Sequence, residues 1–227
     1  MKNAILRQKA ERDKLLSMEY LERVANGMAT SYLPSKLIKL ITGPRRAGKS
    51  SLAVQMLKGK KFAYLNFDDN TLLSGFSEDT VEDLLDEIYP GYEYLLLDEV
   101  QNLNGWSLWV EKLYRRGMNL VITGSNANLL SDDIASVLSG RFLEIRIYPF
   151  SAREYLEHIT GAGNESLTDY AVYERYLNYG GYPEVALTPQ VTQGYLSSLY
   201  DSTIVKDLVR RYNIRKVDDL YSIANWL

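Results

Sequence analysis

The chain contains no cysteine and only one histidine, His158, among its 227 residues. Without cysteine it forms neither disulfide bonds nor thiolate metal sites, and one histidine gives no basis for a zinc cluster or a Ser-His-Asp triad. Any metal must therefore be bound by oxygen ligands, which favours Mg²⁺.

Long hydrophobic runs are also absent. The longest lie at residues 37–41 and 94–97, far short of the roughly 18 apolar residues that a membrane-spanning helix needs. The first residues are charged and lack the apolar stretch of a secretory signal. These absences predict a cytoplasmic protein that does not contact a membrane.

An excess of positive charge is missing as well, since the net charge is −3 and the pI is near 5.4. This balance argues against a chain that is a nucleic-acid binder throughout. A local basic segment nevertheless runs from Lys206 to Lys216 and includes Arg210, Arg211 and Arg215. A solvated helix face and a DNA-contacting surface both remain open for it, and the charge pattern favours the first.

The hydrophobic pattern predicts an α/β core with a smaller helical part. Residues 3–26 are expected to form one charged helix that Gly27 ends. From residue 36 onward, β-rich runs alternate with helical ones, which indicates a parallel sheet covered by helices on both faces. The expected strands are 37–42, 62–67, 94–98, 119–123 and 142–147, and the expected helices are 49–57, 80–89, 105–116 and 131–139.

After residue 150 the pattern is helical, with helices expected at 152–159, 168–179 and 189–212, a loop at 161–164 and a turn at 180–183. We therefore expect an N-terminal helical segment (1–35), a sheet core (36–150), a helical subdomain (151–216) and a final segment (217–227). The final segment is expected to begin a further helical unit, so that the natural protein would be longer.

The clearest motif is a complete G-x-x-x-x-G-K-[ST] between an expected strand and an expected helix. In such a loop, backbone N–H groups and the helix N-terminus face phosphates. Lys49 is expected to reach the β- and γ-phosphates, and the Ser50 hydroxyl is expected to coordinate Mg²⁺. The candidate nucleotide-binding residues are Gly43, Pro44, Arg45, Arg46, Ala47, Gly48, Lys49, Ser50 and Ser51.

Two carboxylates, Asp98 and Glu99, end the hydrophobic strand 94–98. Asp98 is expected to help hold Mg²⁺ indirectly, by bonding to the groups that coordinate the ion. Glu99 would orient and polarise the attacking water. A water-activating glutamate favours hydrolysis over transfer to a second substrate.

Two further catalytic candidates lie later in the chain. Ser125 or Asn126, after the strand 119–123, could contact both the γ-phosphate and the water, and a plain turn is the alternative. Arg141 could stabilise transition-state charge within the chain or across a subunit interface, and an ordinary surface arginine is the alternative.

With these motifs placed, the chain resembles the AAA+-like ATPases of archaea and bacteria of the AAA_14 plus DUF4143 type. The resemblance covers nearly the whole chain and depends on the order and spacing of short segments. These are the loop from Gly43, Leu-Asp-Glu-Val-Gln from Leu97, Thr-Gly-Ser-Asn from Thr123, Ser-Gly-Arg-Phe from Ser139, Tyr-Pro-Phe-Ser from Tyr148, Gly-Gly-Tyr-Pro-Glu from Gly180 and Tyr-Leu-Glu-Arg from Tyr20.

The resemblance implies an ASCE-type P-loop core with strand order 5-1-4-3-2 and a helical lid. It also implies that residues 20–23 lie near the nucleotide base, and that a winged-helix and nuclease-like region follows. Relatives often have serine where this chain has Asn126, so the identity of the γ-phosphate sensor stays open between Ser125 and Asn126.

The leading functional hypothesis is Mg²⁺-dependent ATP hydrolysis that drives a conformational cycle of the helical and C-terminal parts. The alternative is an ATP-gated switch or scaffold with very slow turnover. ATP and Mg²⁺ are the expected cofactors, and DNA and a second copy of the chain are candidate partners. A P-loop kinase is disfavoured because nothing resembles an acceptor pocket.

Overall fold

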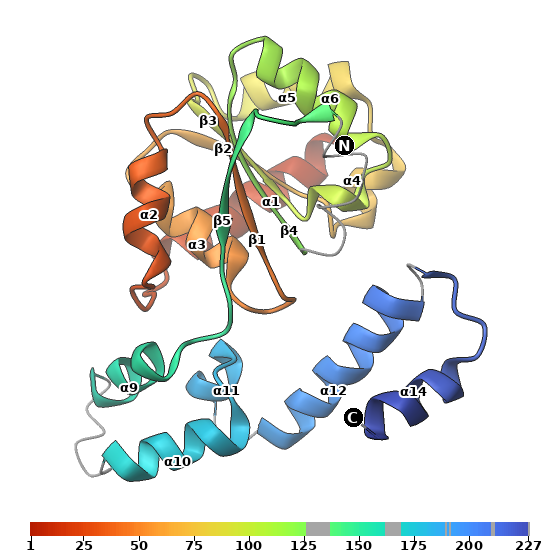
Figure 1. The fold of residues 1–227 in the computed structure, drawn as a ribbon. Helices are drawn as coiled ribbons and strands as arrows, with labels where there is room; N and C mark the ends of the chain where they lie inside the picture. The colour runs from red at the N-terminus through yellow and green to blue at the C-terminus, as the bar shows by residue number, and fades with distance from the viewer. Residues whose placement is uncertain (126–136, 162–168, 189, 191, 210–211, 227) are drawn as a thin grey trace. The chain divides into compact units, whose positions relative to one another are not determined.

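The computed structural model describes residues 1–125, 137–161, 169–188, 190, 192–209 and 212–226. The chain divides into two compact units, Met1–Glu154 and Tyr155–Leu227. Figure 1 colours the chain by residue number from red at the N-terminus to blue at the C-terminus. We describe each unit by itself. The expected domain limits remain a prediction.

The first unit is built on a five-stranded sheet in which every pairing is parallel. Its strands are β1 (Ile38–Gly43), β2 (Phe62–Asn66), β3 (Tyr94–Asp98), β4 (Asn119–Ser125) and β5 (Phe142–Arg146). The order across the sheet is β2-β3-β4-β1-β5, which confirms the predicted order 5-1-4-3-2. The predicted and observed strand ends differ by at most two residues.

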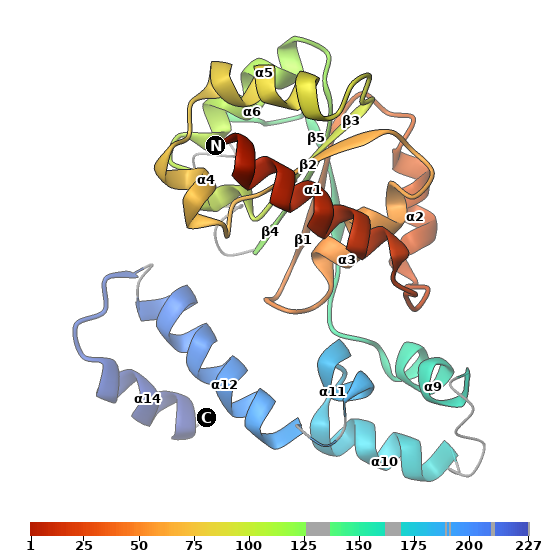
Figure 2. The ribbon, with the colours of Figure 1, turned by 180° about the vertical axis from the view of Figure 1, so that it is seen from behind.

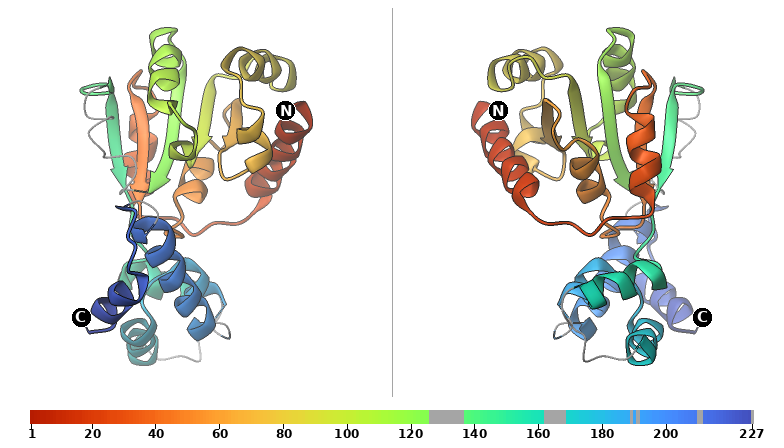
Figure 3. Two further views of the ribbon diagram at one scale, coloured as in Figure 1. Left: turned by 90° about the vertical axis from the view of Figure 1, so that its right-hand side faces the viewer. Right: turned by 90° about the vertical axis from the view of Figure 1, so that its left-hand side faces the viewer.

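Helices cover both faces of this sheet, as Figures 2 and 3 show. Alternate residues along a strand point to opposite faces, so Leu40 and Leu95 enter one buried cluster while Ile41 and Leu96 enter the other. The helices described before β5 are α1 (Lys2–Ser17), α2 (Ala25–Tyr32), α3 (Lys49–Met56), α4 (Asn70–Ser74), α5 (Glu78–Ile88) and α6 (Trp106–Arg115), with a 3-10 turn at Val100–Asn102.

The expected single helix over residues 3–26 is wrong. The chain leaves helical geometry at Met18, whose φ is −75° and ψ is 148°, and Gly27 lies inside α2 instead of ending a helix. Long-range contacts explain the break, because Arg23 bonds with residues that are more than a hundred positions away. Such tertiary contacts outweigh a weak helical propensity.

α1 covers the edge strand β2. The Gln8 side chain donates to the Asn66 carbonyl and accepts from the Asn66 N–H, both at 3.0 Å. The Arg12 guanidinium lies over the Phe62 and Tyr89 rings. The N–H and carbonyl of Asn66 on the edge strand are thereby satisfied by a side chain of α1.

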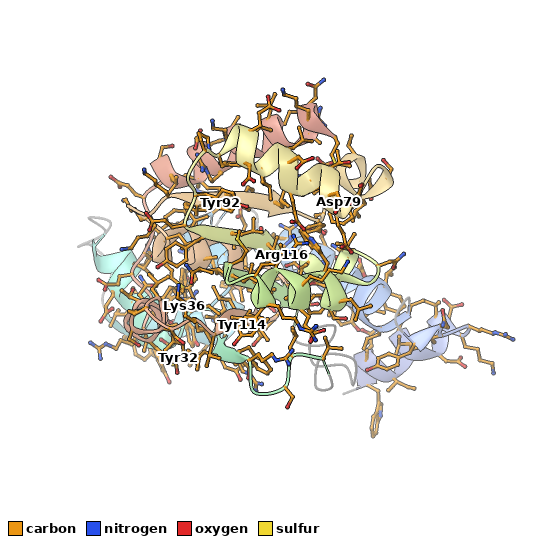
Figure 4. All side chains as sticks on the ribbon, turned by 90° about the horizontal axis from the view of Figure 1, so that it is seen from above. Tyr32, Lys36, Asp79, Tyr92, Tyr114 and Arg116 are labelled. Atoms are coloured by element: carbon orange, nitrogen blue, oxygen red, sulfur yellow. The ribbon has the colours of Figure 1, made fainter. Side chains whose placement is uncertain are left out.

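Figure 4 looks onto the edge at which the strands begin, with Lys36 labelled just before β1 and Tyr92 just before β3. Lys36 donates to Asn119 Oδ1 at 3.4 Å at this edge. The loop that follows β1 and the carboxylates that end β3 lie at the opposite edge. The candidate site is therefore confined to the ends of the strands.

Every helix or strand described in the second unit is a helix. α9 (Ala152–Gly161) leads into it, and α10 (Asp169–Tyr179), α11 (Pro183–Leu187), α12 (Thr192–Thr203), a π-helical turn (Ile204–Val209) and α14 (Val217–Trp226) follow. Edge-to-face ring contacts join Tyr155 to Tyr176 and Tyr200 to Tyr221.

Three expectations need correction or fall outside the description. The expected helix over 189–212 is not one α-helix, because α12 ends at Thr203 and passes into the π-helical turn. Pro183, the last residue of the expected turn, is instead the first residue of α11, since proline is tolerated in a first helical turn. Most of the expected helix 131–139 lies outside the described residues.

Candidate nucleotide site

The loop between β1 and α3 depends on two glycines. Gly43 has φ +154°, and a Cβ there would lie 2.2 Å from the Ile147 carbonyl oxygen. Gly48 has φ +96° and directly precedes the first residue of α3. Both positions favour glycine, because a side chain would clash at Gly43 and would strain the backbone at Gly48.

α3 begins at Lys49 and points its N-terminus at the loop. The first N–H groups of a helix have no partner within the helix, and this end carries partial positive charge. The N–H of Leu52 is bonded to the Gly48 carbonyl, whereas those of Lys49, Ser50 and Ser51 precede the first helical bond. The loop and helix start together can hold a phosphate group.

Lys49 spans the loop and meets a carboxylate. Its Nζ atom donates to the Pro44 carbonyl at 3.1 Å and lies 3.3 Å from Glu99 Oε1. Its side chain is only 3% exposed. The positive charge is thus held inside the loop and is partly neutralised by Glu99.

Asp98, at the end of β3, accepts three hydroxyl hydrogen bonds. Its Oδ1 atom accepts from Ser50 Oγ at 2.9 Å and from Thr123, and its Oδ2 atom accepts from Tyr64 at 3.2 Å. Burial raises the pKa of Asp98 to about 6, although the hydrogen bond from Thr123 lowers it in part. The negative charge of the neighbouring Glu99 adds to the increase. The residue is therefore ionised at neutral pH and poorly solvated.

Glu99 adopts a left-handed backbone with φ +51°, which is uncommon for a residue with a side chain. Its N–H donates to Thr123 Oγ1 at 3.1 Å, and its Oε2 atom accepts from Gln101 at 2.6 Å. Backbone strain of this kind clusters at functional sites. The turn directs the Glu99 carboxylate towards Lys49.

The remaining candidates are placed differently. Ser125 is buried and lies beside Gly43 in the strand register, so β4 brings it to the start of the loop. Asn126 lies outside the described residues. Arg141 precedes β5 next to Ile38, about 16 Å along β1 from the loop at 3.3 Å per residue.

Arg141 donates to Glu111 at 2.6 Å and to the Val137 carbonyl at 3.2 Å. The fold of one chain therefore does not bring Arg141 to the loop.

Sequence reasoning predicted no bond for four residues that contact the site, which are Arg23, Tyr64, Gln101 and Thr123. For Arg23 the family resemblance implied only a place near the nucleotide base. Tyr64 and Thr123 lie inside strands and resemble ordinary core positions. Arg23 belongs to a segment that was expected to be helix. Only Gln101, two residues after Glu99, could have been suspected from the sequence.

The donor chemistry fits magnesium. The Ser50 hydroxyl, which offers an oxygen ligand of the kind that Mg²⁺ takes together with water and phosphate, is held at 2.9 Å by the Asp98 carboxylate behind it. Over the described residues, no group of three or more histidine, cysteine, aspartate or glutamate side chains forms a separate metal cage. No helix in the described part of the chain is long and apolar enough to cross a membrane.

Comparison with known proteins gives consistent results. The AAA domain family AAA_14 matches residues 35–156. An uncharacterized protein of Haemophilus influenzae is 35% identical over 204 residues, which is 84% of this chain and 50% of that protein. One of Methanocaldococcus jannaschii is 31% identical over 208 residues, 86% of this chain and 47% of the relative. The chain thus spans about half the length of these curated relatives.

A solved Walker-type ATPase of Pyrococcus abyssi has a similar fold, with a TM-score of 0.57 at 16% identity over 93% of this chain and 80% of that one. This likeness concerns the fold alone, because the identity is low. The family match covers the loop, both carboxylates and all five strands. The chain therefore belongs to the AAA_14 family of AAA domains and has the fold of a P-loop NTPase.

Proposed function

We propose that the chain binds Mg²⁺-ATP at the 43–50 loop and hydrolyses it, and that the nucleotide cycle changes the conformation of the helical part. One observation carries the proposal. Lys49, Ser50, Asp98 and Glu99 come from two separate elements and meet within hydrogen-bonding or ion-pair distance at one edge of the sheet. This is a compact set of one cation, one hydroxyl and two carboxylates beside a helix N-terminus.

Each residue has a role that its contacts support. Lys49 would exchange the Glu99 carboxylate for the β- and γ-phosphates, which carry more charge. Ser50 and Asp98 would hold Mg²⁺, which supplies charge neutralisation on the phosphates. Release of Glu99 from Lys49 would free that carboxylate to orient the attacking water.

Two further roles belong to the proposal. Ser125, beside Gly43 in the register, or Asn126 after it would sense the γ-phosphate. Arg141 would act on the site of a neighbouring copy, because it lies far from the loop of its own chain. An arginine supplied across an interface stabilises the transition state of phosphoryl transfer.

The decisive experiment measures Mg²⁺-dependent phosphate release from ATP over a series of protein concentrations. We expect release to vanish in Lys49→Ala and Glu99→Gln and to persist in Lys58→Ala, an exposed lysine after α3 that provides the matched control. Specific activity that rises with concentration would support a site completed by a second copy. Equal activity in Glu99→Gln and the unaltered chain would refute the proposed water-activating role.

An ATP-gated switch with very slow turnover is the second candidate. Both Glu99 oxygens are engaged, by Lys49 and by Gln101, so the carboxylate is held away from a water-activating role in this conformation. Saturable ATP binding, an ATP-dependent change in proteolysis and no turnover would favour the switch over the hydrolase.

DNA contact through residues 206–216 stays a separate proposal, supported by the basic composition of that segment. A salt-sensitive mobility shift of a labelled duplex would support it. No shift at low salt would contradict it for this chain.

A further inference from the structure

Arg23, in the segment between α1 and α2, lies against the phosphate-binding loop. Its Nη1 atom donates to the Ala47 carbonyl at 3.0 Å, its Nε atom to Glu154 at 2.9 Å and its Nη2 atom to the Tyr148 carbonyl at 2.6 Å. The guanidinium also lies 4.7 Å from the centroid of the Phe150 ring. One side chain thus joins the loop to the segment that follows β5.

The charge on Arg23 is balanced inside the protein. The side chains of Arg23 and Glu154 are 7% and 6% exposed. Burial by itself would raise the pKa of Glu154, but N–H groups of Ser151 and Val24 and the Arg23 guanidinium hold that pKa below its usual value. Removing either partner would leave a buried charge without compensation, which is costly.

Glu154 has two roles, one for each carboxylate oxygen. Oε1 accepts from Arg23 and from the Val24 N–H at 2.9 Å, whereas Oε2 accepts from the Ser151 N–H at 2.8 Å. The Glu154 N–H donates back to Ser151 Oγ at 3.3 Å. Ser151 and Glu154 therefore form a capping box that starts α9, and the same carboxylate holds Arg23.

The contact with Ala47 determines the direction of a neighbouring N–H group. In a trans peptide unit the carbonyl and the following N–H point in opposite directions. Because the Ala47 carbonyl points at Arg23, the Gly48 N–H of the same unit points away from Arg23. A P-loop needs such N–H groups directed at the phosphates.

We propose that Arg23 and Glu154 form a positioning pair that fixes the Ala47–Gly48 peptide for phosphate binding and couples phosphate occupancy to the first turn of α9. This inference rests on the proposed nucleotide binding and adds two residues to it. Neither residue touches the reacting atoms, so both would act through the loop.

The test begins with ATP affinity and turnover measured in the whole chain. Arg23→Gln is expected to weaken ATP binding about tenfold, as loss of a charged hydrogen bond would, with turnover at saturating ATP changed less than about threefold. Arg23→Lys keeps the positive charge but cannot make all three hydrogen bonds of the guanidinium. Its ATP affinity should therefore lie between those of the unaltered chain and Arg23→Gln. Arg12→Gln, an arginine at the β2 edge, is the matched control and should bind ATP normally.

A second measurement separates coupling from general stabilisation. ATP should slow amide hydrogen exchange in peptides covering 43–50 and 150–157 of the unaltered chain, but only in 43–50 of Arg23→Gln. If Arg23→Gln does not fold, Arg23→Lys is used for the same comparison.

The outcomes distinguish the two proposals. No ATP binding by the unaltered chain would overturn both proposals. ATP binding and turnover in the unaltered chain, with unchanged affinity and unchanged protection of 150–157 in the Arg23 variants, would overturn only the positioning pair.

Discussion

At the scale of single residues, the site combines a buried carboxylate with a strained loop. Asp98 keeps three hydroxyl partners because a carboxylate at a strand end cannot otherwise be buried at tolerable cost. The motif residues could be predicted from the sequence, since their types and spacing reflect phosphate chemistry directly. The bonds of Arg23, Tyr64 and Thr123 could not, because these bonds join distant segments, and the family resemblance implied only a place near the nucleotide base for residues 20–23.

Asp98 should make stability depend on pH in a characteristic direction. Its pKa is about 6 in the folded chain and about 3.9 when unfolded, so the folded state binds more protons between these values. This contribution to stability is complete below about pH 4 and is lost as the pH rises through 6.

The variant Asp98→Asn removes that titration and keeps the shape of the side chain. Relative to Asp98→Asn, the unaltered chain should lose up to about 3 kcal/mol of unfolding free energy between pH 4 and 7. Urea unfolding of both proteins across this range measures the difference. A difference that does not vary with pH would contradict the raised pKa.

The two loop glycines should differ in their tolerance of alanine. Gly43→Ala places a Cβ against the Ile147 carbonyl, whereas a Cβ at Gly48 meets only Arg23, at 3.5 Å. Gly48→Ala should therefore cost only the strain of its positive φ, about 1–2 kcal/mol, and Gly43→Ala should cost more. Thermal unfolding of both variants provides the comparison, and Gly59→Ala, with φ +80° and an open surrounding, is the matched control for Gly48→Ala.

At the scale of elements, the strands were predictable because each is a short buried run with turns around it. The break between α1 and α2 was not, because residues 18–24 have no strong breaker before Gly27. What interrupts the helix is a set of contacts that Arg23 and the Val24 N–H make with the loop and with Glu154. Local pattern carries no information about such partners.

Gln8 should be important for the attachment of α1 to the sheet. Gln8→Ala leaves the N–H and carbonyl of Asn66 without their side-chain partners. We expect a loss of about 2 kcal/mol in unfolding free energy, since unmet buried groups are costly. Chemical unfolding measures it, with the exposed Glu11→Ala in the same helix as control. Equal stability of both variants would show that α1 is held by other contacts.

At the scale of the whole molecule, two of the three tryptophans lie in opposite environments. Trp109 is 1% exposed in the core of the first unit, whereas Trp226 in α14 is 85% exposed. Trp226→Phe should therefore abolish the fluorescence component that acrylamide quenches most easily, while leaving the shielded component of Trp109. Unchanged quenching would contradict the exposed position of Trp226, and Trp109→Phe provides the opposite control.

The position of α1 also has a consequence for the solution behaviour of the protein. β2 is the last strand on its side of the sheet, and an uncovered edge strand offers a template on which other chains can add strands. Gln8 bonds the main chain of Asn66 on that edge, and Arg12 bonds the carbonyl of Phe62. By covering the polar row of β2, the N-terminal helix opposes edge-to-edge aggregation, a protection that a chain shortened past residue 17 would lose.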